Sequence, residues 1–143
     1  MKLLIPFVIA LLSNPVAATE PSAVTTTSAT YVEALGVENG FLHAWVNRDA
    51  NTGLTLMSPT LRQPPRGNES WLRLYVQGIS NPHHQAFELQ RGELIANRAV
   101  FPVTLYELYS GESTANSYAS SIELVREGES WHVSKLPKSS DNE

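Results

Sequence analysis

The chain contains no cysteine, and this absence excludes several kinds of chemistry at once. Without a thiol there is no disulfide, no thiolate metal ligand, no cysteine nucleophile and no lipid attached to an N-terminal cysteine. Basic residues are also few: 10 Lys and Arg stand against 14 Asp and Glu, which gives a formal net charge of −4 at pH 7. Because nucleic-acid binding needs clustered Lys and Arg, we expect no nucleic-acid partner.

The common sequence signatures of catalytic and metal sites are missing as well. The chain has no Gly-rich phosphate loop, no Gly-x-Ser-x-Gly nucleophile elbow and no His-Glu-x-x-His metal motif. His83 and His84 are adjacent at the start of an expected strand, where neighbouring side chains face opposite sides of a sheet. Two such histidines are poorly placed to share an ion, so we predict neither a metal site nor a cofactor.

The N-terminal residues have the pattern of an export signal. Lys2 gives a positive start, the segment from Leu3 to Leu12 is apolar, and small residues precede a cleavage point after Ala18. The apolar segment is well short of the roughly 20 residues that span a bilayer. We therefore predict a signal peptide over residues 1–18 and an exported protein, periplasmic or secreted, with no stable membrane anchor.

The rest of the chain is long enough for one domain. Its 143 residues are 42% hydrophobic and 17% charged, which is typical of a globular protein. Residues 19–29 are rich in Thr, Ser and Ala and are predicted to form a flexible leader. Residues 138–143 are polar and are predicted to be a disordered tail, which leaves a domain over residues 30–137.

Three helices are expected in the first half of this domain. The first covers about Tyr31 to Asn47 and begins with a capping box at Thr30, with Glu38 expected on the face opposite its apolar residues. A short second helix covers 50–57 with Asp49 as its N-cap. The third starts at Asn68 or Glu69 and runs to Ser80, and its apolar face consists of Trp71, Leu72, Tyr75, Val76 and Ile79.

The second half alternates apolar and polar residues with a period of two, which is typical of strands. One begins near Phe87, and residues 94–109 are predicted to be a single long strand in which Pro102 indicates an edge position or a bulge. A hairpin is expected to turn at Gly128. Helices followed by a meander predict an α+β fold, with the N-terminal helices packed on a curved antiparallel sheet.

Three stretches of the chain resemble the NTF2-like superfamily, also called the SnoaL-like or cystatin-like cone superfamily. They are Phe41–Ala50, Val100–Glu107 and Ile122–Val133, and the resemblance covers roughly residues 31–136. It implies a cone formed between helices and sheet, in an exported, bacterial-type member. The superfamily includes enzymes, transport factors, secretion subunits and ligand binders, so the resemblance leaves the function open.

In enzymes of the superfamily, an acid–base residue projects into the cone beside a proton donor. The catalytic candidates here are Asp49, His43 and Tyr106. Each also has a structural interpretation: a helix cap for Asp49, a surface or core histidine for His43, and a wall residue for Tyr106. Because no catalytic set of the superfamily matches position by position, we assign no catalytic residue.

We therefore expect an exported, non-enzymatic module that binds a small apolar ligand or a partner protein in the envelope. Its aromatic residues are predicted either to line a cavity or to fill the core: Trp45, Trp71, Tyr75, Phe87, Phe101 and Trp131. A SnoaL-like isomerase, dehydratase or hydrolase is an alternative, which a buried Asp49 carboxylate with a raised pKa would favour over one that caps a helix.

A second alternative is an accessory subunit of an envelope assembly. Members of the superfamily often dimerise through the open face of the sheet, and a homodimer of that kind is expected here. An exposed apolar patch on residues 94–109 would favour such an assembly.

Overall fold

The computed structural model describes residues 28–63, 69–77 and 83–138. These residues form four helices, followed by five strands. The helices are α1 (Ala29–Asn47), α2 (Ala50–Leu56), α3 (Pro59–Arg62) and α4 (Glu69–Gln77). The strands are β1 (His83–Leu89), β2 (Glu93–Ile95), β3 (Arg98–Leu108), β4 (Asn116–Glu127) and β5 (Ser130–Lys135).

Some predicted segments fall outside the described residues. The signal peptide over 1–18, almost all of the leader over 19–29 and the tail after Lys138 are among them. The predicted end of the third helix at Ser80 is another, since the description of α4 stops at Gln77. None of the described helices is both long enough and apolar enough to cross a membrane.

The helix boundaries follow from their caps. The first helix begins at Ala29, ahead of the predicted Tyr31, because the Ser28 hydroxyl accepts the Tyr31 N–H at 3.2 Å and takes the place expected of Thr30. It ends at Asn47, and its C-cap Arg48 has a left-handed φ of 60°. This turn lets α2 begin at once, and its predicted cap is confirmed.

The segment after α2 differs from the prediction. Pro59 is the first residue of α3, a short helix that was not predicted, and Ser58 caps it by accepting the Leu61 N–H at 3.1 Å. Met57 lies next to Val133 of β5 in a parallel bridge, and the Ser58 N–H donates to the Val133 carbonyl at 2.8 Å.

The strands form one antiparallel sheet in the order β1-β3-β4-β5, with β2 also paired to β3. The prediction of one strand over 94–109 is wrong, because the chain reverses at Ala96, whose φ is 54°. Strands β2 and β3 therefore pair with each other, with Leu94 opposite Ala99.

Pro102 lies on a central strand, whereas the sequence predicted an edge or a bulge. Its carbonyl accepts the Gln90 N–H at 3.2 Å, just where β1 ends at Leu89 and before β2 begins. The backbone nitrogen and carbonyl of a strand residue point to the same side. The missing N–H of Pro102 therefore faces the gap between β1 and β2, where it interrupts no ladder.

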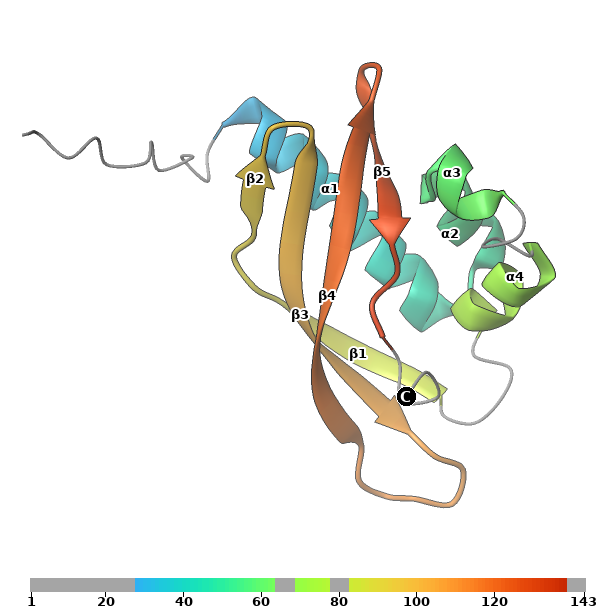
Figure 1. Cartoon of the computed structure of the whole chain (residues 1–143). Coiled ribbons are helices and arrows are strands. Elements are labelled where there is room, and N and C mark those ends of the chain that lie inside the picture. The colour runs from blue at the N-terminus through green and yellow to red at the C-terminus, as the bar shows by residue number, and fades with distance from the viewer. Residues whose placement is uncertain (1–27, 64–68, 78–82, 139–143) are drawn as a thin grey trace, which may run out of the picture.

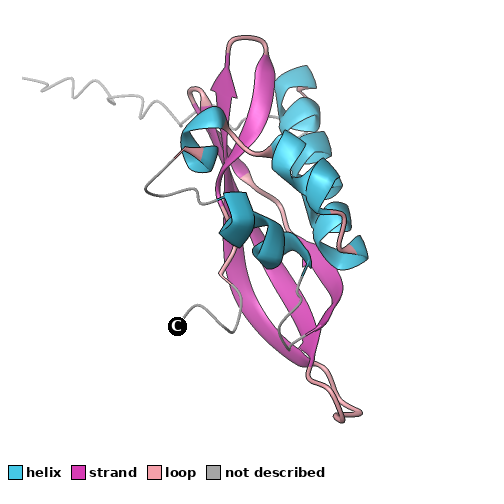
Figure 2. Cartoon of the chain, turned by 90° about the vertical axis from the view of Figure 1, so that its right-hand side faces the viewer, coloured by secondary structure: helices cyan, strands magenta, loops and turns pink. Residues whose placement is uncertain are grey.

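The core lies between α1 and the inner face of the sheet. Figures 1 and 2 show α1 lying across one face of the sheet, with the shorter helices beside the β5 edge. The inward residues of β3 are fully buried. The predicted hairpin is confirmed, with Gly128 at a φ of 65°. The buried hydrophobic residues of the strands are Ala99, Phe101, Val103, Leu105, Ile122, Leu124, Trp131 and Val133.

Candidate functional site

A buried pair of acid–base side chains lies at the C-terminal end of α1. His84 comes from β1 and Glu107 from β3, and the two residues are direct partners in the sheet register. His84 is 7% exposed and Glu107 is 0% exposed. The His84 Nε2 lies 3.6 Å from the Glu107 Oε1. We refer to these two residues as the His84–Glu107 pair.

The orientation of His84 is fixed by Trp45. The His84 Nδ1 lies 3.2 Å from the Trp45 carbonyl oxygen, which can only accept, so Nδ1 carries a proton. The imidazole also stacks on the Trp45 indole, with ring centroids 3.5 Å apart and planes at 15°. The Nε2 is thereby directed at the Glu107 carboxyl.

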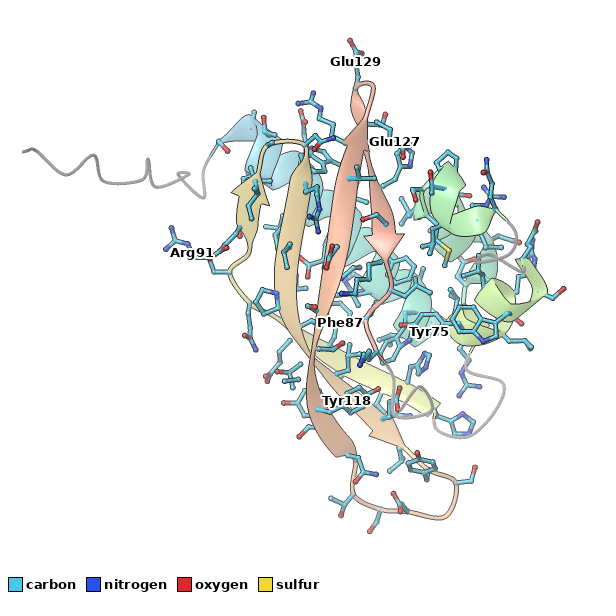
Figure 3. All side chains as sticks on the ribbon, in the orientation of Figure 1. Tyr75, Phe87, Arg91, Tyr118, Glu127 and Glu129 are labelled. Carbon is cyan, nitrogen blue, oxygen red and sulfur yellow. The ribbon has the colours of Figure 1, made fainter. Side chains whose placement is uncertain are left out.

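Two tyrosines accompany this pair. Tyr75 of α4 is buried, and its hydroxyl donates to the Pro137 carbonyl at 2.5 Å. Burial raises the pKa of Tyr75 well above its ordinary value, and the charges of Tyr118 and Glu107 raise it further, so Tyr75 remains a neutral phenol. Figure 3 shows Tyr75 and Tyr118 in the half of the molecule opposite the β4–β5 turn, where Glu129 lies.

A second set of polar groups is buried without any hydrogen-bond partner among the described residues. Both carboxyl oxygens of Glu38 belong to it, as do the indole nitrogens of Trp45 and Trp131. The Nε of Arg126, on β4, is another such atom. We call Glu38, Trp45 and Trp131 the unpaired interior set.

Glu38 lies on the buried face of α1, contrary to the prediction that placed it opposite. It is 0% exposed, and burial raises the pKa of its carboxyl to about 8, with no neighbouring charge contributing. At neutral pH it is therefore an uncharged acid. The helical spacing of Tyr31, Ala34, Leu42 and Trp45 places position 38 on the same face, so the sequence did contain this signal.

The sequence analysis also missed Glu107, although a signal for it was present. Phe101, Val103 and Leu105 all face inward, and the alternation continues to position 107. Its partner His84 was considered only as a metal ligand. His83 faces away from it and contacts the Arg48 guanidinium at the surface. Among the described residues, no group of three or more potential ligands is arranged to hold a metal ion.

The three catalytic candidates are not brought together. Asp49 is exposed and accepts from the Thr52 N–H at 3.1 Å, and its hydrogen bonds with Thr52 lower the pKa of its carboxyl. His43 is exposed on α1 and touches the edge of Phe87. Tyr106 lies on the outward face of β3 beside Glu88, where partial burial and the Glu88 carboxylate raise its pKa. A helix-capping Asp49 was the arrangement expected of a binding module.

The aromatic residues predicted to line a cavity separate into two groups. Trp45, Tyr75, Phe101 and Trp131 are buried, and Phe87 is partly buried. Trp71 is 44% exposed, which corrects the prediction that placed it on the buried face of its helix. The buried stripe of α4 consists of Leu72, Tyr75 and Val76, and Trp71 lies to one side of it with its ring 5.7 Å from Tyr75.

The apolar patch that would favour an assembly was expected on residues 94–109, all of which the structure describes. The large exposed hydrophobic residues of the described chain are Val32, Trp71, Leu74, Leu89 and Ile95, and only Ile95 falls within 94–109. A cavity of about 310 Å³ does lie outside the core, beside α3. Its strand residues Arg98, Val125 and Ser134 alternate with buried ones, so it is separate from the interior between α1 and the sheet.

Comparison with known proteins gives matches only among solved structures, since no family model and no curated protein matches the chain. A SEC-C motif-containing protein from Rhodopseudomonas palustris has a TM-score of 0.57 at 10% identity, covering 72% of this chain and 75% of that one. An LEH-like epoxide hydrolase from M. tuberculosis has a TM-score of 0.55 at 13% identity, covering 71% and 74%.

A third similar structure is a protein from Campylobacter jejuni described as an NTF2-like transpeptidase. Its TM-score is 0.50 at 10% identity, and the match covers 71% of this chain and 97% of that one. At such identities the likeness shows the fold alone. The predicted α+β architecture of helices on a curved antiparallel sheet is confirmed.

Proposed function

We propose, given the NTF2-like fold of this chain, that it is an exported, non-catalytic module that binds a small, largely apolar ligand within its cone. The observation that carries the proposal is the unpaired interior set, Glu38, Trp45 and Trp131. Buried polar groups in folded proteins almost always have a hydrogen-bond partner, and losing one costs about 1–3 kcal/mol. A ligand bound among the surrounding apolar side chains would supply the partner that the protein does not.

The non-catalytic part of the proposal is supported by the positions of the candidate residues. Asp49 caps a helix, and His43 and Tyr106 lie outside the core, so none of the three can act on a ligand within it. Export rests on the N-terminal pattern of Lys2 and the apolar segment that follows. It is tested by expressing the full chain in bacteria, fractionating the cells and determining the N-terminal residue of the mature protein.

Ligand binding is tested by native mass spectrometry and by thermal-shift screening of the purified protein against small apolar molecules. We expect at least one molecule to raise the melting temperature in a concentration-dependent way. Trp131→Phe removes an interior N–H while keeping an aromatic ring, and should weaken that effect. Trp71→Phe makes the same change on an exposed residue and serves as the control. Loss of binding in the control but not in Trp131→Phe would argue against an interior site.

A second candidate function is an acid–base enzyme, and the buried His84–Glu107 pair is the observation that favours it. A buried carboxyl group beside a histidine whose tautomer is fixed is a usual arrangement for general acid–base catalysis. The test is to incubate a bound ketone in D2O and to measure deuterium incorporation at its α-carbon. Exchange that disappears in His84→Gln and Glu107→Gln would establish the enzyme, whereas binding without exchange supports the module.

A further inference from the structure

We propose that the cavity beside α3 is a separate binding site, outside the interior, and that it takes a small zwitterion: a free amino acid with an apolar side chain. The cavity has a volume of about 310 Å³, which is at the lower end of the range for small-molecule sites in proteins. It is lined by residues at the start of α3 and by outward-facing residues of β3, β4 and β5. The inference goes beyond the proposed function and does not depend on it.

The cavity forms where the start of α3 meets the outward face of the sheet. Arg98 of β3 and Val125 of β4 are direct partners in the sheet register, and both lie on the face opposite the core. The Ser58 N–H donates to the Val133 carbonyl at 2.8 Å, which fixes the start of α3 at the β5 edge. In Figure 2, α3 lies at this edge on the side away from α1. The cavity therefore has one wall of strands and one of helix, joined by a backbone hydrogen bond.

Two opposite charges line the cavity without pairing with each other. Glu127 follows Val125 on β4 by two residues, so it lies on the same face and is a diagonal neighbour of Arg98. Diagonal neighbours on a sheet are about 7–8 Å apart. Among the residues that the structure describes, no cation pairs with the Glu127 carboxylate. Figure 3 shows Glu127 on the α3 side of the β4–β5 hairpin, where its carboxylate is available to a ligand ammonium group.

Arg98 keeps hydrogen-bond donors for a ligand carboxylate. Its Nη2 donates to the Glu123 Oε2 at 2.5 Å, and the Lys135 Nζ donates to the Oε1 of the same carboxylate at 3.1 Å. These bonds from Lys135 and Arg98 lower the pKa of Glu123, which therefore shares a single negative charge between two cations. A guanidinium has five N–H groups, and this pairing uses one of its nitrogens. The remaining N–H groups of Arg98 suit a carboxylate, which guanidinium groups bind with two parallel hydrogen bonds.

A buried hydroxyl and two apolar side chains complete the lining. Ser58 is 1% exposed; its hydroxyl oxygen accepts the Leu61 N–H at 3.1 Å, and no described residue accepts its proton. A ligand carboxylate oxygen would accept that proton. The side chains of Leu61 and Val125 offer an apolar surface. A free amino acid has a group for each feature, whereas an amine leaves Arg98 unmatched and a carboxylic acid leaves Glu127 unmatched.

Three probes of nearly the same shape separate these cases. Leucine carries both charges, isopentylamine lacks the carboxylate, and isocaproate lacks the ammonium group. Dissociation constants are measured at neutral pH and low salt by NMR titration, from the backbone amide signals of the residues that line the cavity. The variants are Arg98→Gln and Glu127→Gln. The matched controls are Arg91→Gln and Glu129→Gln, which make the same charge changes at exposed residues outside the cavity lining.

We expect leucine to bind about fivefold more tightly than either single-charge probe, which is the effect of one partly exposed charge pair. Arg98→Gln should remove the preference over isopentylamine and keep the preference over isocaproate. Glu127→Gln should do the reverse. Both controls should keep both preferences. The ratio of two affinities in one variant does not depend on that variant's stability, and added salt should reduce both ratios in the wild type.

Several results would overturn the inference. Isopentylamine binding as tightly as leucine would identify a cation site, and isocaproate binding as tightly would identify an anion site. A preference for leucine that survives both cavity variants, or that a control also removes, would place the ligand elsewhere. If no probe produces a saturable shift at the lining residues, the cavity does not bind this class of ligand. None of these results bears on the interior, because binding there is tested with small apolar molecules and Trp131→Phe.

Discussion

The two ends of α1 meet the sheet in opposite ways. At the N-terminal end, the Tyr31 ring packs on Phe101 and its hydroxyl accepts the Gly92 N–H at 3.2 Å, so an apolar contact is closed by one satisfied polar group. At the C-terminal end, Trp45 stacks on His84, which faces Glu107. The N-terminal end is held by an apolar ring contact, and the C-terminal end by a buried polar pair.

This difference determines how each end contributes to stability. Burying apolar rings is directly stabilising, whereas a buried ionisable pair gains little net stability because desolvation offsets the attraction between its members. The Tyr31 end is also tightly specified, because a Cβ at Gly92 would clash with the Phe101 ring. We therefore expect any loss of a ring at the Tyr31 end to lower stability, whereas at the His84 end the loss should be large only when one member of the pair is removed without the other.

The largest effect is expected at the apolar end. Phe101→Ala removes a fully buried ring that contacts Tyr31 and should lower the free energy of unfolding by about 4 kcal/mol. Urea denaturation followed by tryptophan fluorescence measures it, with Trp71→Ala as an exposed control. A loss similar to that of the control would mean that this end does not hold the fold together.

The next largest effect is expected at the C-terminal end of α1, where His84 and Glu107 are buried. Glu107→Leu leaves His84 without its carboxyl partner and should cost about 3 kcal/mol, because a buried polar group loses its compensation. The double variant His84→Leu with Glu107→Leu removes both members and should recover a large part of that loss. A double variant no more stable than the single one would show that the pair is itself a major stabilising element.

A smaller effect is expected along the middle of α1. The pKa of Glu38 is about 8 in the folded protein and 4.5 as its ordinary value, so the folded state binds the extra proton between these limits. Stability should therefore fall as the pH rises from 4.5 towards 8, by at most about 1.4 kcal/mol per pH unit. Glu38→Gln should remove this slope. The free energy of unfolding of both proteins is measured by urea denaturation at several pH values, and equal slopes in the two proteins would contradict the expectation.

The smallest effect concerns the turn just past the polar end. Asp49 is exposed and caps α2, so Asp49→Ala should lower the melting temperature slightly and speed hydrogen exchange at the Thr52 amide. Asn caps equally well, and Asp49→Asn should behave like the wild type. Because hydrogen bonds lower the pKa of Asp49, its contribution should be lost only as the pH falls through that lowered value. Equal exchange in both variants would mean that the cap is unimportant.

Local signals in the sequence were sufficient for much of the fold. The first helix, the Asp49 cap and the hairpin at Gly128 each depend on residues close together in the chain, and all three were predicted. The separation of β2 from β3 was not predicted, because Ala96 adopts a left-handed conformation that alanine rarely takes. The capping box predicted at Thr30 does not cap the helix, because Ser28, an equally good N-cap just upstream, does so instead.

The candidate site was harder to predict because it depends on long-range register. His84 and Glu107 meet only because β1 pairs with β3 at that position, which no local pattern determines. Glu38 was misplaced for another reason: a charged residue was assumed to face solvent, although its helical position pointed inward. A polar residue at a core position was therefore the informative feature of the sequence.

The bridge between Met57 and Val133 has a consequence for how copies of the protein behave at high concentration. Strand β5 ends the sheet, and an uncovered final strand offers its backbone to any extended chain that comes near. The segment joining α2 to α3 covers the β5 edge at Val133, where the Ser58 N–H donates to the Val133 carbonyl. The chain thus protects part of its own sheet edge against edge-to-edge aggregation.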